Sequence, residues 1–155
     1  GYDLLNLGRK IERADMTTRI IDVRAENTIP DDAPELKPFE DMLWMSMLKS
    51  LSGYQMYRQS MQIRIQRNDV LKFLFMRTSF PRSVSYCVNN MGENLSSLPN
   101  NEECLSNINT LKNTLNSAPT ETLDNDALHQ YIDKIQLQLA KLHNDIQKTY
   151  FQAFK

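Results

Sequence analysis

The chain has 155 residues, of which 41% are hydrophobic, and its 18 basic and 19 acidic side chains leave a formal net charge of −1. This length predicts one domain, and the near-neutral charge disfavours a function in nucleic-acid binding. No apolar run approaches the roughly 18 residues of a transmembrane helix, and no signal peptide is visible, so we expect no membrane association.

The two cysteines, Cys87 and Cys104, do not form a CxxC motif. We interpret them as reduced core thiols, which fits a cytoplasmic protein, and leave a disulfide or a reactive thiol as the alternative. Only four glycines are present, which disfavours a turn-rich all-β fold and phosphate-binding loops. The chain starts at Gly1 rather than at Met, with a helical pattern already under way, so we expect it to be part of a longer protein.

Helical spacing of apolar residues predicts the first helix over residues 2–26. Its core face consists of Leu4, Leu7, Ile11, Ala14, Thr18, Ile21 and Ala25. At about 100° per residue, Glu12, Asp15, Arg19 and Asp22 fall along one flank of that face. Because an unpaired charge is costly at the edge of a core, we expect these four residues to form a buried polar seam.

Three prolines within residues 28–38 predict a loop. A second helix is expected from about residue 39 to residue 66, with Gly53 as a weak point or a close-packing contact. A third, short helix over residues 69–77 is apolar nearly all round and should be buried. A β-strand is the alternative for this short apolar run.

The second half of the chain also has helical spacing. Pro81 suits the first position of a helix over residues 81–98, and another helix is expected over residues 102–116. The last helix runs almost to the end of the chain, and its cap candidates are Thr122, Asp124 and Asn125. The sequence therefore predicts an all-α fold, a compact bundle of about six helices in a single domain spanning residues 1–155.

The charged residues of the first helix form the first candidate site. Asp15 and Arg19 have i,i+4 spacing, Arg19 and Asp22 have i,i+3 spacing, and Arg9 and Arg13 project further round the helix. The arrangement fits a structural ion-pair network that fixes how the helix docks. A pocket for an anionic or zwitterionic ligand and an ordinary solvated surface are the alternatives.

Aromatic and basic residues of the second helix form another candidate group. Tyr54 and Arg58 are i,i+4 neighbours, Tyr57 lies close to both, and Trp44 precedes them. Trp and Tyr rings are usually buried, with one partner for the N–H or O–H group. We interpret them as core anchors, and the lining of a ligand groove is the alternative.

Arg82 and Ser83 lie at the predicted start of the fourth helix, where free backbone N–H groups make an anion site conceivable. Ser83 capping its own helix is the alternative, and no acidic or histidine partner marks it as a nucleophile. His129 and His143, the only two histidines, are 14 positions apart on one helix, about 21 Å. We therefore predict no metal site and no cofactor.

Three motifs resemble the bacterial alpha-E domain family, a helical family named for its Glu-Arg motif. The first is Gly8-Arg9-x-x-Glu12-Arg13-Ala14-Asp15, continuing to Thr18-Arg19-Ile20-Ile21-Asp22. The second is Trp44 with Leu48, Tyr54 and Tyr57-Arg58, and the third is Phe73-Leu74-Phe75 with Phe80-Pro81-Arg82-Ser83-Val84-x-Tyr86-Cys87. Together they cover roughly residues 5–90.

The resemblance implies that this chain is the C-terminal half of a protein about twice as long. It also implies partners, because alpha-E proteins are encoded beside or fused to ATP-grasp-type ligases and transglutaminase-like proteins of peptide-modification systems. We therefore expect a non-catalytic binding or scaffold domain that holds such a partner, a peptide, or the N-terminal half of the same protein. The residues expected to bind are Arg9, Glu12, Arg13, Asp15, Arg19, Asp22, Trp44, Tyr54, Tyr57, Arg58, Arg82 and Ser83.

Two alternatives to a binding domain stay open. The first is an enzyme of the same system, with Glu12 as acid or base and the arginines binding a carboxylate or phosphate. An open cavity within reach of Glu12 would favour it, whereas a fully paired, dry Glu12 would favour a structural role. The second is an oligomerisation module, which would leave a large apolar patch exposed on the isolated chain.

Overall fold

The computed structural model describes residues 1–26, 32–61, 64–117 and 123–152, and it confirms the all-α class within these ranges. The α-helices are α1 (Tyr2–Glu26), α2 (Lys37–Ser50), α3 (Tyr54–Met61), α4 (Arg67–Met76), α5 (Val84–Ser96), α6 (Glu102–Ser117) and α7 (Asn125–Ile146). A 3-10 turn over Pro34–Leu36 precedes α2, and a π-helical turn over Gln147–Phe151 extends α7.

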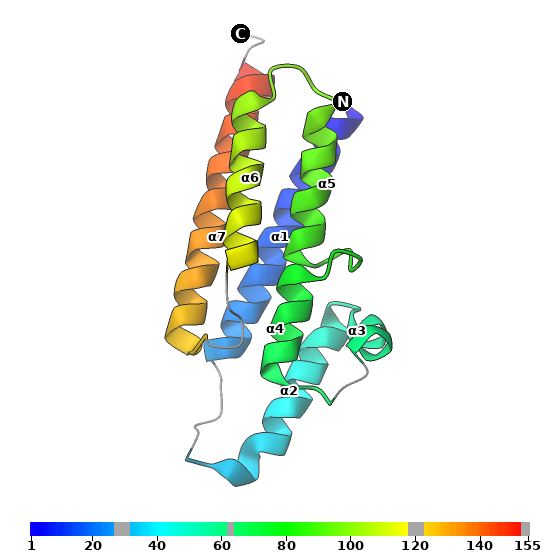
Figure 1. The fold of residues 1–155 in the computed structure, drawn as a ribbon, viewed down its shortest axis with the longest axis vertical. Helices are drawn as coiled ribbons and strands as arrows, with labels where there is room; N and C mark the ends of the chain where they lie inside the picture. Colours follow the sequence, from blue (N-terminus) through cyan, green and yellow to red (C-terminus); the bar gives the residue numbers. More distant parts are fainter. Residues whose placement is uncertain (27–31, 62–63, 118–122, 153–155) are drawn as a thin grey trace.

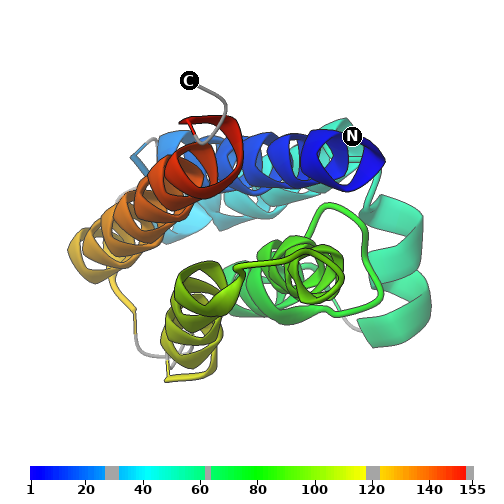
Figure 2. The ribbon, with the colours of Figure 1, turned by 90° about the horizontal axis from the view of Figure 1, so that it is seen from above.

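Four long helices form an antiparallel bundle, in which α1 packs between α5 and α7, and α6 packs against both of those (Figure 1). The view from above shows α1 and α7 on one side and α5 and α6 on the other (Figure 2). Helix α4 continues below α5, while α2 and α3 extend the lower end of the molecule. The first turn of α1 and the last turn of α7 lie at the upper end, so these two helices run side by side in opposite directions.

The core runs through the bundle and continues under α4. Val70, Leu71, Phe73, Leu74 and Phe75 of α4 are all buried, so the prediction of a buried helix is confirmed and the strand alternative is wrong. This helix has almost no polar side because other helices cover it from several directions.

The predicted helix over residues 39–66 is two helices, α2 and α3, which raises the number from about six to seven in the described ranges. Ser52 has φ 59°, a left-handed conformation that ends α2. Gly53 follows Ser52 and packs against the Phe80 ring. A Cβ built at Gly53 would lie 2.8 Å from Cζ of Phe80. The close-packing interpretation of Gly53 is therefore confirmed.

The fourth predicted helix begins later than expected, at Val84 rather than Pro81. Ser83 is its N-cap and accepts a hydrogen bond from the backbone N–H of Tyr86 at 3.0 Å. Asp124 caps α7 in the same way, through the N–H of Ala127 at 2.8 Å. The other cap candidates differ, because Asn125 is the first residue of α7 and Thr122 lies outside the described residues.

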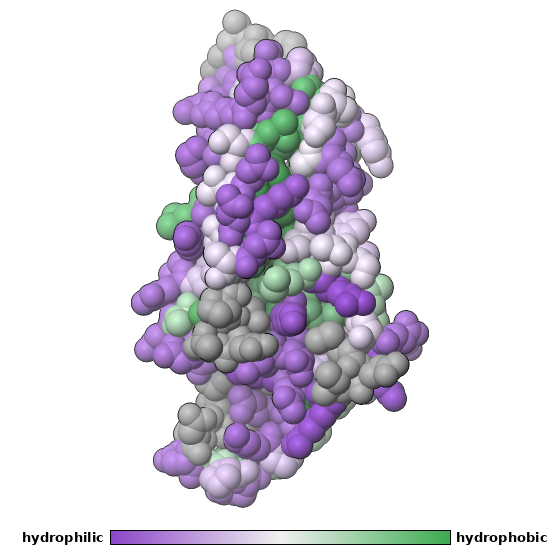
Figure 3. Space-filling model, viewed as in Figure 1, coloured by the Kyte–Doolittle hydropathy of each residue, from purple (hydrophilic) through white to green (hydrophobic). Residues whose placement is uncertain are grey.

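The face in Figure 3 is mainly hydrophilic, with a narrow line of hydrophobic atoms between α5 and α6. None of the described helices has the length and hydropathy needed to span a bilayer. Cys87 and Cys104 are both buried and form no disulfide, as predicted.

Candidate functional site

Helix α1 has a second, solvent-exposed side opposite the core, which we call the α1 outer face. It consists of Leu5, Gly8, Glu12, Met16, Arg19 and Val23. Leu5, Met16 and Val23 are 56%, 59% and 59% exposed. Two shallow hollows, of about 500 Å³ and 400 Å³, lie along this face and share Glu12 in their lining. The face combines apolar side chains with charges of both signs.

The expectation of a buried seam through Glu12 and Arg19 is wrong. Glu12 is exposed and has no hydrogen bond or ion pair with another described residue. Arg19 Nε does pair with Asp15 Oδ2 at 2.7 Å, but the Arg19 side chain is 67% exposed. On a helix, Asp15 and Asp22 lie about 60° from the centre of the apolar stripe, whereas Glu12 and Arg19 lie about 120° from it. Only the nearer pair reaches the edge of the core.

The polar contacts that α1 makes with its neighbours come mainly from uncharged residues. The Thr17 hydroxyl donates to the carbonyl of Arg82 at 2.9 Å, and the Gln136 side chain on α7 donates to Thr18 Oγ1 at 3.3 Å. Within the described ranges, Asp22 is the one seam residue with a partner on another helix, and that partner is His129. The predicted Arg19–Asp22 contact is not among the ion pairs of the described residues.

The Glu-Arg motif at Glu12 and Arg13 faces two directions. Arg13 is half-buried on the side toward α5, where its charge favours ionisation of the Cys87 thiol. Burial outweighs that influence and raises the pKa of Cys87 to about 11. Arg9 is exposed and lines the smaller hollow of the α1 outer face. The two arginines therefore do not converge on Glu12 in one pocket.

Trp44 and Tyr57 are fully buried, so the prediction that they are core anchors is confirmed. Neither the Trp44 indole N–H nor the Tyr57 hydroxyl has a hydrogen-bond partner among the described residues, although one was expected. The half-buried Tyr54 lies beneath two cations, with Lys49 Nζ at 5.0 Å and the Arg58 guanidinium carbon at 5.8 Å from its ring centroid. Tyr54 and Arg58 also line an open, shallow hollow of about 400 Å³, together with Gln55 and Gln59.

Ser83 is fully buried, and its hydroxyl both donates and accepts a hydrogen bond within the chain. It accepts from the N–H of Tyr86 and donates to the carbonyl of Arg77, which is the capping role that the sequence left open. The side chain of Arg82 is exposed, while its carbonyl accepts from Thr17. The turn before α5 therefore holds α1 in place through its backbone.

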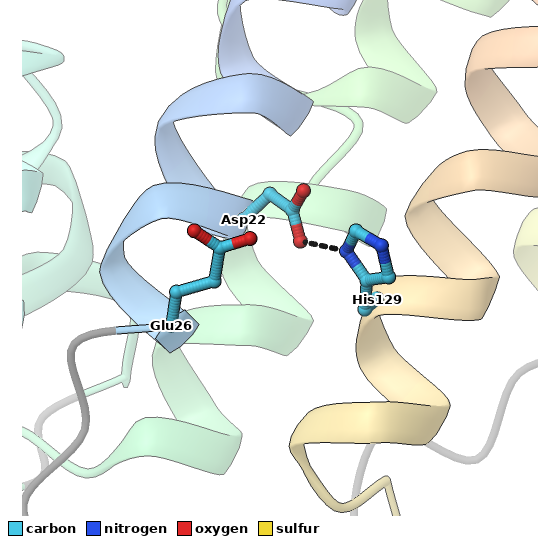
Figure 4. A group of neighbouring side chains, drawn as sticks. All are labelled: Asp22, Glu26 and His129. Atoms are coloured by element: carbon cyan, nitrogen blue, oxygen red, sulfur yellow. Dashed lines mark hydrogen bonds and ion pairs between the residues drawn. The ribbon is translucent and has the colours of Figure 1, made fainter.

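A cluster of ionisable side chains joins the end of α1 to the start of α7 (Figure 4). Asp22 and Glu26 of α1 face His129 of α7, and their ligand-type atoms all lie within 4.8 Å of one another. His129 Nδ1 lies 2.8 Å from Asp22 Oδ1, and its Nε2 lies 3.4 Å from Asp133 Oδ2. The hydrogen bond with Asp22 and the surrounding carboxylates raise the pKa of His129.

Sequence reasoning missed this cluster, apart from Asp22. Glu26 and His129 were not singled out, because the two histidines were compared only with each other. One signal was present: Asp22 and Glu26 have i,i+4 spacing, which places both carboxylates on the same side of α1. Their histidine partner is 107 positions from Asp22, and only the packing of α7 on α1 brings it there.

A family model for Alpha-E, described as a predicted alpha-helical domain with a conserved ER motif, matches residues 1–151. The match extends well beyond the stretch that carries the three motifs. No curated protein and no solved structure matches the chain. Glu12 and Arg13 on α1 supply an ER pair, and the described fold is helical. The chain therefore belongs to the Alpha-E family of helical domains.

Proposed function

We propose that this chain is a helical binding or scaffold domain that docks a partner protein along the α1 outer face. The observation that carries the proposal is the row of exposed apolar residues Leu5, Met16 and Val23. These positions span about 27 Å of helix, on the side of α1 turned away from the core. Apolar side chains gathered on one exposed face are typical of interaction sites.

Gly8 gives independent support for docking at this face. A glycine inside a helix costs about 1 kcal/mol relative to alanine. Packing of the described residues does not require it, because a Cβ built at Gly8 would lie more than 4 Å from every heavy atom of their neighbouring elements. A glycine on an exposed helix face leaves room for the close approach of another backbone. The face therefore suits a partner that packs tightly against α1.

The chemistry of the face favours an amphipathic helix as the docked element. Helix-in-groove recognition uses apolar anchors at i, i+3, i+4 and i+7 spacing, and Leu5, Met16 and Val23 offer complementary positions. Glu12 and the exposed side chain of Arg9 border these anchors, so a partner helix with charges beside its apolar stripe fits best. Such rim charges contribute more to specificity than to affinity.

We further propose that the partner is an ATP-grasp-type ligase or a transglutaminase-like protein of a bacterial peptide-modification system in the cytoplasm. The motifs shared with alpha-E proteins support this assignment, since such proteins are encoded beside those enzymes. The N-terminal half of a longer chain and a peptide are the alternative occupants of the same face. All three would present a segment to α1, and binding assays separate them.

The surroundings of Glu12 favour binding over catalysis. A general acid or base needs a confined position beside the reacting group, whereas Glu12 is exposed on an open, shallow surface. An oligomerisation module remains the second candidate, because the exposed apolar residues of α1 would also suit a second copy of the chain.

The test is a binding measurement between this chain and the purified ligase or transglutaminase-like protein encoded beside it. Met16→Asp places a charge at the middle of the α1 outer face and should weaken binding at least about tenfold. Leu137→Asp is the matched control, because Leu137 is 72% exposed on α7 and outside that face. Equal binding by both variants would refute docking at α1.

Sedimentation of the chain alone separates the second candidate from the first. A monomeric wild type that binds the ligase supports the scaffold function. A wild-type dimer that Met16→Asp dissociates and Leu137→Asp preserves would replace it with the oligomerisation module.

A further inference from the structure

We propose that Asp22, Glu26 and His129 form a binding site for one zinc ion, which bridges the end of α1 and the beginning of α7. This site does not depend on the docking function, because its three ligands lie between α1 and α7 (Figure 4) and none of them belongs to the α1 outer face. It also departs from the expectation, based on the two histidines, that the chain has no metal site.

The distances suit three ligands on one ion. Zinc is bound by histidine nitrogen and carboxylate oxygen at about 2.0–2.2 Å, so two ligand atoms on the same ion lie about 3–3.5 Å apart. His129 Nδ1 and Asp22 Oδ1 are already 2.8 Å apart, and Glu26 completes a set within 4.8 Å. Closing the set around one ion requires the exposed Glu26 carboxylate to move closer to the other two ligands.

Secondary structure places these ligands without strain. Asp22 and Glu26 are one turn apart on α1, so their carboxylates share one side of the helix. His129 is in the second turn of α7, which runs antiparallel beside α1. Ligands from two packed helices are a common way to build metal sites in helical bundles.

The negative charge around His129 favours the binding of a cation. Asp22, Glu26 and Asp133 put three carboxylates around one imidazole, and no lysine or arginine among the described residues forms an ion pair with any of them. The group therefore keeps a net charge of about −2 even when His129 is protonated. A divalent ion that displaces the His129 proton removes most of this repulsion.

Asp133 supplies the outer support that a histidine ligand usually has. A metal-bound histidine donates its other ring N–H to a carboxylate or carbonyl, which orients the ring and fixes its tautomer. Here Nδ1 faces Asp22 while Nε2 lies 3.4 Å from Asp133 Oδ2 on the next turn of α7. This second contact leaves the Nδ1 lone pair directed at the two carboxylates of α1.

The proposed zinc site is open to solvent and has fewer than four protein ligands. The His129 side chain is 48% exposed, so an ion can enter directly from solvent. Three protein ligands leave the fourth tetrahedral position to water. An ion that binds only the folded chain stabilises it by mass action, and it would clamp α1 to α7 across the bundle.

The test is calorimetric titration of zinc into the untagged, chelator-treated chain at constant pH, with melting curves at the same zinc concentrations. We expect one zinc per chain and a higher melting temperature. Glu26→Gln should lower the affinity at least about tenfold, and Asp133→Asn about 10- to 100-fold. His143→Gln and Glu93→Gln are matched controls that remove a histidine and an exposed carboxylate elsewhere, and both should bind as the wild type does.

Glu26→Gln also separates a metal site from a simple ion pair. Glu26 has no hydrogen bond or ion pair with another described residue, so the zinc-free melting temperature should stay unchanged while the zinc-induced rise disappears. The proposal is overturned if zinc does not bind the wild type at one equivalent. It is also overturned if His129→Gln binds zinc as well as His143→Gln does.

Discussion

Alanine at two different glycines should change the stability of this protein in opposite directions. Gly8 is in the interior of α1, where an added Cβ meets no heavy atom of another described element within 4 Å. Gly53 precedes α3, where an added Cβ would lie 2.8 Å from Cζ of Phe80 and 3.3 Å from both Cε atoms. Gly8→Ala therefore tests the effect of backbone entropy, whereas Gly53→Ala tests the effect of steric overlap with Phe80.

The magnitudes follow from these surroundings. Gly8→Ala should raise the free energy of unfolding by about 0.5–1 kcal/mol, because alanine favours the helix and restricts the unfolded chain. Gly53→Ala should lower it by about 1–3 kcal/mol, the usual cost of overpacking. The Phe80 ring has little freedom to retreat, since it is 3% exposed and stacks on Phe73 with ring centroids 4.9 Å apart.

Urea unfolding followed by circular dichroism measures both changes in the free energy of unfolding. In thermal unfolding, each kcal/mol of that change should move the melting temperature by about 2–4 °C in a domain of this size. Gly8→Ala should also weaken binding of the partner, although it stabilises the free chain. A destabilised Gly8→Ala variant would refute the argument that no described residue packs against that position. A neutral Gly53→Ala variant would show that Phe80 yields easily.

Two other variants test charge and burial. Glu12→Ala should leave the free energy of unfolding within about 0.5 kcal/mol of the wild type, because Glu12 is exposed and unpaired among the described residues; a loss of several kcal/mol in urea unfolding would restore the buried seam. Burial raises the pKa of the Cys87 thiol from 9.0 to about 11, so unfolded chains ionise first above pH 9. The stabilising contribution of Cys87, complete below pH 9, should then fall by about 1.4 kcal/mol per pH unit up to pH 11. Unfolding of the wild type and Cys87→Ala at pH 8 and pH 10 measures this, and a constant difference between them would contradict it.

Helical periodicity was sufficient to predict the bounds of α1 and the core face of α7. Leu7, Ala14 and Ile21 are buried where the 3-4 spacing places them, because a helix converts spacing directly into a common face. The buried character of α4 followed from its local composition. The same approach failed over residues 39–66, where it predicted one helix but the chain turns between α2 and α3.

Periodicity determines the direction of a side chain around its helix axis, but not what covers that direction. Asp15 and Asp22 both lie beside the apolar stripe of α1, about 60° from its centre, and the sequence assigned them to one buried seam. In the fold, α7 brings His129 to Asp22, whereas Asp15 pairs with Arg19 of its own helix. The sequence by itself determined the helices and their core faces. Only the packing of α5 and α7 around α1 decided which of its charges meet a partner.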